Sequence, residues 1–242
     1  MQIVGLNSTF RQLFYAVFAS IFIFLSVYYL LQINEEVYPV YIQYQQHPQI
    51  ILDAGHGGMD GGAVASNGVV EKHINLSIVQ KLNTLLQING FDVILTRSSD
   101  DSIHDDEETT ISGQKRSDMY NRMKIIQKYP HAVFVSIHQN MYNDITCKGT
   151  QVFYGTNHEQ SENLASKLQN TFCQRLQPDN TRQIKAADNN LFLLYNSDIP
   201  AVMVECGFLS NPEECTQLCD DAYQRQIAYM IYLSLLDFYS EP

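Results

Sequence analysis

Hydrophobic positions divide the chain into one long apolar segment near the N-terminus and a following region of shorter, alternating runs. Residues 13–33 hold a single Gln and no charged side chain. A helix of this length rises about 30 Å, which matches the hydrocarbon core of a bilayer. The pattern therefore predicts a transmembrane signal-anchor helix at 13–33, preceded by a short cytoplasmic N-terminus at 1–12.

The charges that flank this segment predict its orientation. Arg11 precedes it, whereas Glu35 and Glu36 follow it, so the positive-inside rule places the rest of the chain outside the cytoplasm. A cleaved signal peptide is the alternative interpretation. Its apolar core is usually shorter and is followed by a small-residue cleavage site, which the sequence YYLLQI at 28–33 does not supply. We therefore favour an uncleaved anchor.

After a tether at 34–48, the region 49–242 alternates between two kinds of hydrophobic pattern. Short apolar runs predict strands at 49–52, 91–96, 132–137, 150–154 and 201–204. Helical spacing predicts helices at 71–88, 114–127 and 159–176, and one or two more that end at Phe238. Strands separated by helices of this length indicate a single α/β domain of three layers, with a mostly parallel central sheet flanked by helices.

Composition narrows the class of protein. The 242-residue chain carries 15 Lys and Arg against 26 Asp and Glu, a formal net charge of −11. An acidic surface repels phosphate backbones, so nucleic-acid binding is not expected. The acidic stretch at 100–108 lacks the ligand spacing and turn glycine of a calcium site, which favours a solvated surface loop. The five cysteines include no C-x-x-C pair, so neither a zinc ribbon nor a full disulfide framework is indicated, and their redox state stays open.

Chemically competent side chains follow three of the predicted strands. His56 comes after the first strand, His138 after the strand at 132–137, and Glu205 after the strand at 201–204. Functional residues gather at the carboxyl ends of parallel strands, so these side chains are expected to lie close together. Each also has a plain structural interpretation: an incidental histidine in a glycine turn, a hydrogen-bonded histidine at the core edge, and a carboxylate paired with a cation such as Arg116.

With Glu71, these residues form a recognisable set of ligands. Two imidazoles and one carboxylate are the ligands of a catalytic zinc that keeps an open position for water, although the helix dipole alone explains an acidic residue at the start of a helix. Such a zinc lowers the pKa of its water to about 7 and polarises a carbonyl. The chemistry then needs a free carboxylate to carry the proton. Glu205 is the candidate, because an unpaired charge at the end of an apolar strand is otherwise costly.

The sequence resembles the zinc-dependent N-acetylmuramoyl-L-alanine amidases of bacterial cell walls. The matching motifs are ILDAGHGG at 51–58, DGGA at 60–63, EKHINL at 71–76, LTR at 95–97, RSDMYN at 116–121, SIHQN at 136–140, GT at 149–150 and PAVMVECGFLSN at 200–211. They run in the order of the family and span nearly all of the region after the tether. Several separate motifs in order are far more specific than any one of them.

The resemblance implies the roles of individual residues. One Zn²⁺ would be bound by His56, Glu71 and His138, and Glu205 would be the catalytic glutamate. Gln139 stands where the family commonly has alanine, and little effect is expected from it. Three further residues are candidates for supporting roles. Asp53 and Asn140 would support the site, and Arg116 would position the substrate or Glu205. Surface or packing roles are equally open for all three.

The resemblance also implies an activity and a setting. The enzyme would hydrolyse the amide between the lactyl group of N-acetylmuramic acid and L-alanine in peptidoglycan. A single anchor without wall-binding repeats, together with the motif at 196–212, is similar to the sporulation- and germination-specific type of the family. That type prepares muramic-δ-lactam formation in the spore cortex. The implied location is membrane-anchored, in the forespore intermembrane space of an endospore former, with peptidoglycan as substrate and an accessory or activator protein as candidate partner.

Three other functions are alternatives to this one. A zinc carboxypeptidase would cut within the stem peptide and differs in its products. A thiol hydrolase would use Cys206, but Cys206 and Glu205 are neighbours on a strand and point to opposite faces, so they would not share a site. A non-catalytic, membrane-anchored wall-binding module would be expected to lose a ligand or the glutamate, and this chain keeps all four residues.

Overall fold

The computed structural model describes residues 14–29 and 48–240. The chain divides into two compact units, Met1–His47 and Pro48–Pro242. In the first unit, residues 14–29 are helical, and nearly all of their side chains are exposed. Across the described ranges, no helix is both long and apolar enough to cross a membrane. The predicted span at 13–33 reaches beyond these ranges, because residues 13 and 30–33 lie outside them, as do the predicted N-terminus at 1–12 and the tether up to residue 47.

The second unit is built on one six-stranded sheet with the order β2-β1-β3-β6-β4-β5. The strands are β1 (Gln49–Ala54), β2 (Asp92–Leu95), β3 (Val133–Asn140), β4 (Gln151–Tyr154), β5 (Lys185–Ala186) and β6 (Ala201–Phe208). Neighbouring strands are parallel except β4 and β6, which run antiparallel. The prediction of a single α/β domain is confirmed, and its sheet is mixed, with one antiparallel pairing.

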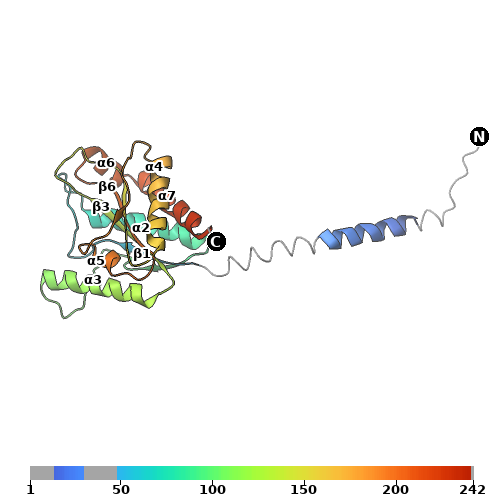
Figure 1. The fold of residues 1–242 in the computed structure, drawn as a ribbon, viewed down its shortest axis with the longest axis horizontal. Coiled ribbons are helices and arrows are strands. Elements are labelled where there is room, and N and C mark those ends of the chain that lie inside the picture. The colour runs from blue at the N-terminus through green and yellow to red at the C-terminus, as the bar shows by residue number, and fades with distance from the viewer. Residues whose placement is uncertain (1–13, 30–47, 241–242) are drawn as a thin grey trace, which may run out of the picture. The chain divides into compact units, whose positions relative to one another are not determined.

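Helices cover both faces of this sheet (Figure 1). They are α2 (Glu71–Ile88), α3 (Ile111–Lys128), α4 (Gln160–Arg175), α5 (Phe192–Tyr195), α6 (Pro212–Cys219) and α7 (Asp221–Ser240). One buried cluster joins one face of the sheet to α2, α4, α6 and α7, and a second joins the other face to α3 and α5. Alternate residues of β1 supply the two faces: Ile50 and Leu52 belong to the larger core and Ile51 to the smaller one.

Local chemistry explains where two helices begin. Helix α3 starts at Ile111, three residues before its predicted start, because the Thr110 hydroxyl accepts a hydrogen bond from the Gly113 N–H and caps the helix. Helix α6 has Pro212 in its first turn, and the Asn211 side-chain oxygen accepts hydrogen bonds from the N–H groups of Glu213 and Glu214. Both caps satisfy backbone donors that a helix leaves unpaired at its N-terminus.

Two strands are longer than predicted, and this changes the position of the candidate site. β3 continues to Asn140 and β6 to Phe208, so His138 and Glu205 lie within strands and do not follow them. The two residues are direct partners in the parallel ladder. Their pairing with each other, together with the pairing of Glu205 with Gln151 of β4, keeps these polar positions in extended conformation, although each interrupts the apolar run from which a strand is predicted.

Candidate metal centre

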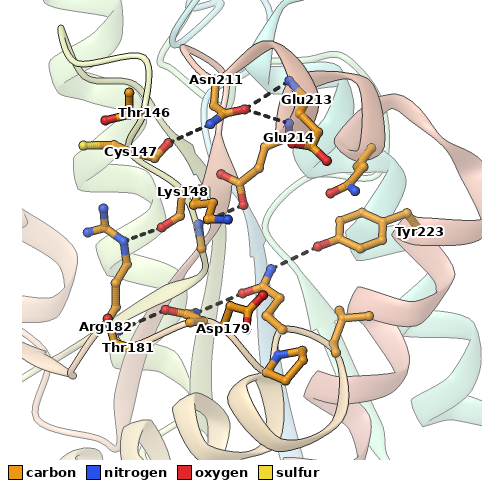
Figure 2. A pocket seen from close by; sticks show the side chains of 16 residues that line it. Thr146, Cys147, Lys148, Asp179, Thr181, Arg182, Asn211, Glu213, Glu214 and Tyr223 are labelled. Atoms are coloured by element: carbon orange, nitrogen blue, oxygen red, sulfur yellow. Dashed lines mark hydrogen bonds between the residues drawn. The ribbon is translucent and has the colours of Figure 1, made fainter.

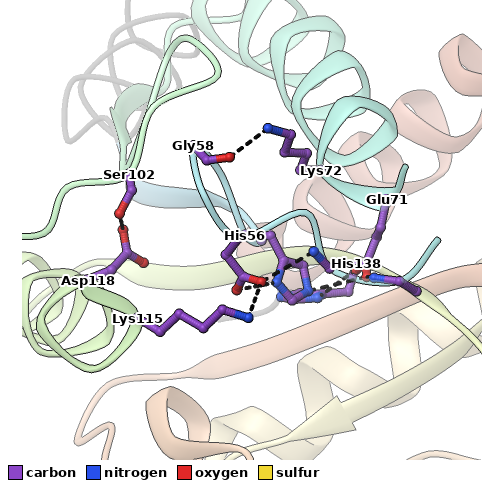
Figure 3. Close-up of polar contacts among 12 residues, drawn as sticks. His56, Gly58, Glu71, Lys72, Ser102, Lys115, Asp118 and His138 are labelled. Atoms are coloured by element: carbon purple, nitrogen blue, oxygen red, sulfur yellow. Dashed lines mark hydrogen bonds and ion pairs between the residues drawn. The ribbon is translucent and has the colours of Figure 1, made fainter. Parts of the chain in front are cut away.

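Three side chains from different elements meet at the carboxyl edge of the sheet (Figure 3). His56 lies in the loop after β1, Glu71 is the first residue of α2, and His138 is in β3. One ligand atom from each lies within 4.8 Å of the others. The Nε2 atom of His56 is 3.2 Å from Glu71 Oε2, and the Nδ1 atom of His138 is 2.9 Å from Glu71 Oε1. Glu71 therefore contacts one nitrogen of each imidazole, and the two rings pack edge to face with their centroids 4.8 Å apart.

Glu71 is held in place by backbone and side-chain donors. It is 3% exposed. The Ala63 N–H donates to its Oε2 atom at 2.8 Å, while the Gln139 N–H and the Asn75 amide donate to Oε1 at 3.0 and 3.1 Å. The Gln139 side chain in turn donates to Asn75 at 3.1 Å. Burial would raise the pKa of Glu71, but the two histidines outweigh it and lower that pKa well below its usual range.

Glycines allow the histidines to approach the backbone. A Cβ atom on Gly62, which has a φ of +71°, would lie 2.5 Å from both the Glu71 carboxylate and the His56 ring. A Cβ atom on Gly55 would collide with the ring of His138. His56 itself has a φ of 62°, a left-handed conformation that is uncommon for a residue with a side chain. Glycine is therefore needed at positions 55 and 62, because a side chain there would collide with the candidate ligands.

Two arginines, one of them fully buried, fix the backbone of this strained loop. Arg122 of α3 is 2% exposed and donates to the carbonyl oxygens of Ala54 (3.0 Å) and His56 (2.8 Å). Arg97, which follows β2, donates to the carbonyls of Ala54 (2.8 Å) and Gly55 (3.1 Å). Buried carbonyl groups need such partners. The sequence alone predicted a role for neither arginine.

Asp53 lies directly beneath the loop as the partner of Arg122. It is 1% exposed, forms an ion pair with Arg122, and accepts hydrogen bonds from the hydroxyls of Thr96 (2.7 Å) and Ser136 (2.6 Å). Burial alone would raise the pKa of Asp53, but these partners lower it to about 2. Asp53 therefore stays ionised and keeps the arginine in place.

Glu205 faces the histidines from β6. Its Oε2 atom is buried and has no hydrogen-bond partner in the part of the chain that the structure describes. Burial, reinforced by the nearby Glu71 carboxylate, raises the pKa of Glu205 to about 7, although His138 and His56 act in the opposite direction. An orphaned carboxylate oxygen beside two imidazoles and a carboxylate fits a metal ion with bound water, because both would supply the missing partners.

The other predicted residues lie in different surroundings. Arg116 is 71% exposed on its side chain and lies 3.9 Å from Glu108, so the structure does not bring it to the histidines. The backbone carbonyl of Asn140 accepts from the Leu209 N–H at 2.8 Å, which joins the ends of β3 and β6. Cys206 is fully buried in the larger core, and burial raises the pKa of its thiol, in agreement with a side chain that points away from Glu205.

The acidic stretch at 100–108 is partly bound to the loop that carries His56. Asp100 pairs with Lys72 at 2.8 Å and accepts from the Gly58 N–H at 3.1 Å, and Lys72 also donates to the Gly58 carbonyl. Further along, Asp105 accepts from Ser117 and Asn121 of α3. The stretch is therefore tied to its neighbours at two points.

Two cavities open near this edge of the sheet. One of about 290 Å³ borders His56 and His138 and has apolar walls from Met119 and Phe192. The second, of about 510 Å³, lies between the segment before β4, the segment that follows α4, and helices α6 and α7 (Figure 2). Its floor includes Glu214, which accepts from the N–H groups of Gly149 and Phe208 at 2.8 Å each. Only the first cavity adjoins the candidate ligands.

Together, the fold and the site define a three-layer α/β protein with a hydrolase-like candidate metal centre at the carboxyl edge of its sheet. The comparisons with known proteins give the family. The chain belongs to the Amidase_3 family of N-acetylmuramoyl-L-alanine amidases, whose model matches residues 50–237.

Individual relatives agree with this assignment. The chain is 34% identical over 192 residues to the germination-specific N-acetylmuramoyl-L-alanine amidase of Bacillus subtilis, covering 79% of this chain and 80% of the relative. Among solved structures, it is similar to the CwlD amidase from Clostridioides difficile in complex with the GerS lipoprotein, with a TM-score of 0.78, 38% identity, and coverage of 81% and 100% of the two chains. It is also similar to an N-acetylmuramoyl-L-alanine amidase from Clostridium difficile 630, with a TM-score of 0.69, 27% identity, and coverage of 81% and 99%. The predicted amidase activity and the resemblance to the germination-specific, CwlD type are confirmed.

Proposed function

We propose that this amidase uses one Zn²⁺ held by His56, Glu71 and His138 to hydrolyse the amide between the lactyl group of N-acetylmuramic acid and L-alanine. The observation that carries the proposal is the meeting of two imidazoles and a carboxylate beside the unpaired oxygen of Glu205. When bound, zinc supplies a Lewis acid for the scissile carbonyl and lowers the pKa of its water.

Residues of this chain would transfer the proton, hold His56 and accommodate the substrate. Glu205, with a carboxylate whose pKa is raised to about 7, is suited to take a proton from water and to return it to the departing alanine nitrogen. The arginines beneath the loop would hold His56 in its strained conformation while the substrate binds. The cavity of about 290 Å³ beside the histidines offers room for a substrate group.

Digestion of purified peptidoglycan by the full chain tests this function. The chain, its Glu205→Gln variant and a chelator-treated sample would be compared, with products identified by mass spectrometry. Release of stem peptides with a free L-alanine amine, leaving bare lactyl groups and lost in both controls, is the expected result. Cleavage within the stem peptide would instead indicate a zinc carboxypeptidase, and unchanged activity in Glu205→Gln would remove Glu205 from the mechanism.

A role in spore cortex maturation is supported by the names of the relatives. One is germination-specific and another is a CwlD amidase in complex with a lipoprotein. We infer that this chain also prepares muramic-δ-lactam formation and works with an accessory lipoprotein. Spores that lack the chain should contain no muramic-δ-lactam, and the purified chain should gain activity or zinc affinity when the lipoprotein from the same organism is added. Normal cortex, or a chain indifferent to the lipoprotein, would contradict the respective inference.

A membrane anchor at 13–33 remains part of the proposal because of the uncharged apolar sequence of these residues. The full chain should then sediment with membranes and resist carbonate extraction, and protease added outside the cytoplasmic membrane should digest the region after residue 34. A chain that starts at a cleavage site after residue 33, identified by N-terminal sequencing, would favour the signal-peptide interpretation.

A further inference from the structure

One face of helix α3 is directed at the loop that carries His56. Lys115, Asp118 and Arg122 are separated by three and four residues, so they share that face. Arg122 holds the backbone of His56 through its carbonyl oxygen at 2.8 Å. Lys115 extends from the same helix toward the histidines (Figure 3) and ends 2.7 Å from Asp60 Oδ1.

Asp60 connects this lysine to the histidine ring. Its other carboxylate oxygen, Oδ2, is 2.8 Å from His56 Nδ1. The backbone brings Asp60 to this place, because the N–H groups of Gly57 and Asp60 each donate to the carbonyl of the other residue, at 2.9 and 3.0 Å. The link therefore runs from α3 through Lys115 and Asp60 to the nitrogen of His56 that does not face Glu71.

We propose that Asp60, itself held by Lys115, is a positioning residue that fixes the ring of His56 for metal binding. The inference rests on the proposed zinc site. A carboxylate that accepts a hydrogen bond from the second ring nitrogen of a ligating histidine sets the tautomer and the orientation of that ring, and it makes the histidine a stronger ligand. With Asp60 on Nδ1, the Nε2 atom of His56 is free to face the same point as Glu71 and His138.

His56 needs such a partner more than His138 does. His138 lies within β3, where ladder pairing with Glu205 of β6 fixes its backbone and hence the direction of its side chain. His56 lies in a loop between glycines, at a φ of 62°, where no regular structure sets the direction of the ring. The neighbouring Asp60–Lys115 pair supplies that constraint at the cost of ordering one lysine, which is 48% exposed on its side chain.

Zinc affinity tests the inference without using enzyme activity. The full chain, Asp60→Ala, Asp60→Asn and Lys115→Gln would be titrated with zinc against a chromogenic chelator. Asp60→Ala should weaken zinc binding by about tenfold to a hundredfold. Asp60→Asn should lose less, because the amide oxygen still accepts from Nδ1–H. Lys115→Gln should weaken binding by a smaller factor, and it should have no further effect when Asp60 is already Ala, since the two residues act in series.

Matched controls separate this role from general stability. Asp221→Asn removes a carboxylate of α7 that pairs with Lys81 of α2 at 2.9 Å and with Arg225, and it should leave zinc affinity unchanged. Melting temperatures measured with chelator present should be similar for Asp60→Asn and Asp221→Asn, and Asp60→Asn carries the test if Asp60→Ala does not fold.

Each result has a distinct meaning. Zinc binding in Asp60→Ala and Asp60→Asn within about twofold of the unmodified chain, with binding still lost in Glu71→Ala, would overturn the role of Asp60 alone. An effect of Lys115→Gln that persists in the Asp60→Ala background would remove the lysine from the link. If the unmodified chain binds no zinc, or if Glu71→Ala binds zinc as tightly as the unmodified chain does, the zinc site of the proposed function is overturned, and this inference with it.

Discussion

Replacing Arg122 with methionine is expected to cost about 3 kcal/mol or more of folding free energy at neutral pH. The substitution keeps the length of the side chain but removes every hydrogen bond that the guanidinium donates. Asp53 loses its buried ion pair, Asp118 loses a donor at 2.6 Å, and the carbonyls of Ala54 and His56 lose donors at 3.0 and 2.8 Å. Removing one partner of a buried pair costs about 3–5 kcal/mol, because the other charge stays buried without compensation.

The pH dependence of this cost follows from Asp53. Burial alone would raise the pKa of Asp53 above its ordinary value of 3.8. Arg122 and the two hydroxyl donors outweigh burial and lower this pKa to about 2. At 1.36 kcal/mol for each pKa unit, the difference stabilises the folded state by about 2 kcal/mol. Because the folded pKa is the lower one, this stability is fully present above about pH 4 and is lost as the pH falls toward 2. At pH 3 about half of it remains, so the effect of Arg122→Met should shrink by about 1 kcal/mol or more between pH 7 and pH 3.

Urea unfolding with chelator present, at pH 7 and pH 3, measures both quantities. Lys124→Met is the matched control, since Lys124 is exposed on the same helix and donates to Asn121 one turn away. Its effect should stay within about 0.5 kcal/mol. Adding Asp53→Asn to Arg122→Met should restore part of the lost stability, because it removes the uncompensated charge. An Arg122→Met protein within about 1 kcal/mol of the unmodified chain, or one equally destabilised at both pH values, would refute the reasoning.

Three further predictions concern the thiol, the loop and the second cavity. Cys206→Ala should keep amidase activity within a few-fold on muropeptide release, because the thiol faces the core; complete loss in a folded variant would revive the thiol mechanism. Gly62→Ala should abolish zinc binding measured by chelator competition. Gly68→Ala should keep zinc binding, because Gly68 also has a positive φ (+86°) but nothing lies within 4 Å of the added Cβ. Equal zinc binding by the two variants would contradict the close approach at Gly62. Glu214→Ala should lower the free energy of unfolding by about 1–3 kcal/mol, because two backbone N–H groups lose their acceptor. Replacing the exposed Glu213 with alanine should cost less. Thermal denaturation of both variants measures the two losses, and equal losses would refute this prediction.

The secondary structure was predictable wherever periodicity ran without interruption. Helix α2 was predicted at 71–88 and is observed there, since its apolar residues keep helical spacing and the turn at Asn89-Gly90 ends it. The strands β3 and β6 were predicted too short, because the apolar run stops at His138 and Glu205 while the ladder continues. β5 was missed altogether. It has two exposed residues, Lys185 and Ala186, and exists only through its pairing with β4.

The candidate ligands and Glu205 were predictable, but the arginines that hold the loop were not. His56, Glu71, His138 and Glu205 have functional groups whose chemistry is evident from the sequence, and the strand ends predict that His56, His138 and Glu205 lie close together. An arginine gives no such signal, because its role depends on which face of a helix it occupies. Arg116 and Arg122 are six residues apart on α3, which is about 240° around the helix axis, so one turned outward while the other reached the buried loop.

The buried charged residues beneath the loop, Asp53, Arg97 and Arg122, position the loop more than they stabilise the fold. A buried ion pair contributes little to stability compared with apolar residues of the same shape, so Asp53 and Arg122 are not explained as a means of stabilising the core. His56 at a φ of 62° is in a conformation that costs about 1–3 kcal/mol and persists only when its surroundings over-determine it. The guanidinium groups of Arg97 and Arg122 supply donors to three successive carbonyls, from Ala54 to His56, which an apolar core could not do. An apolar replacement of the pair would therefore be compatible with a stable fold and still release the histidine that the proposed metal site requires.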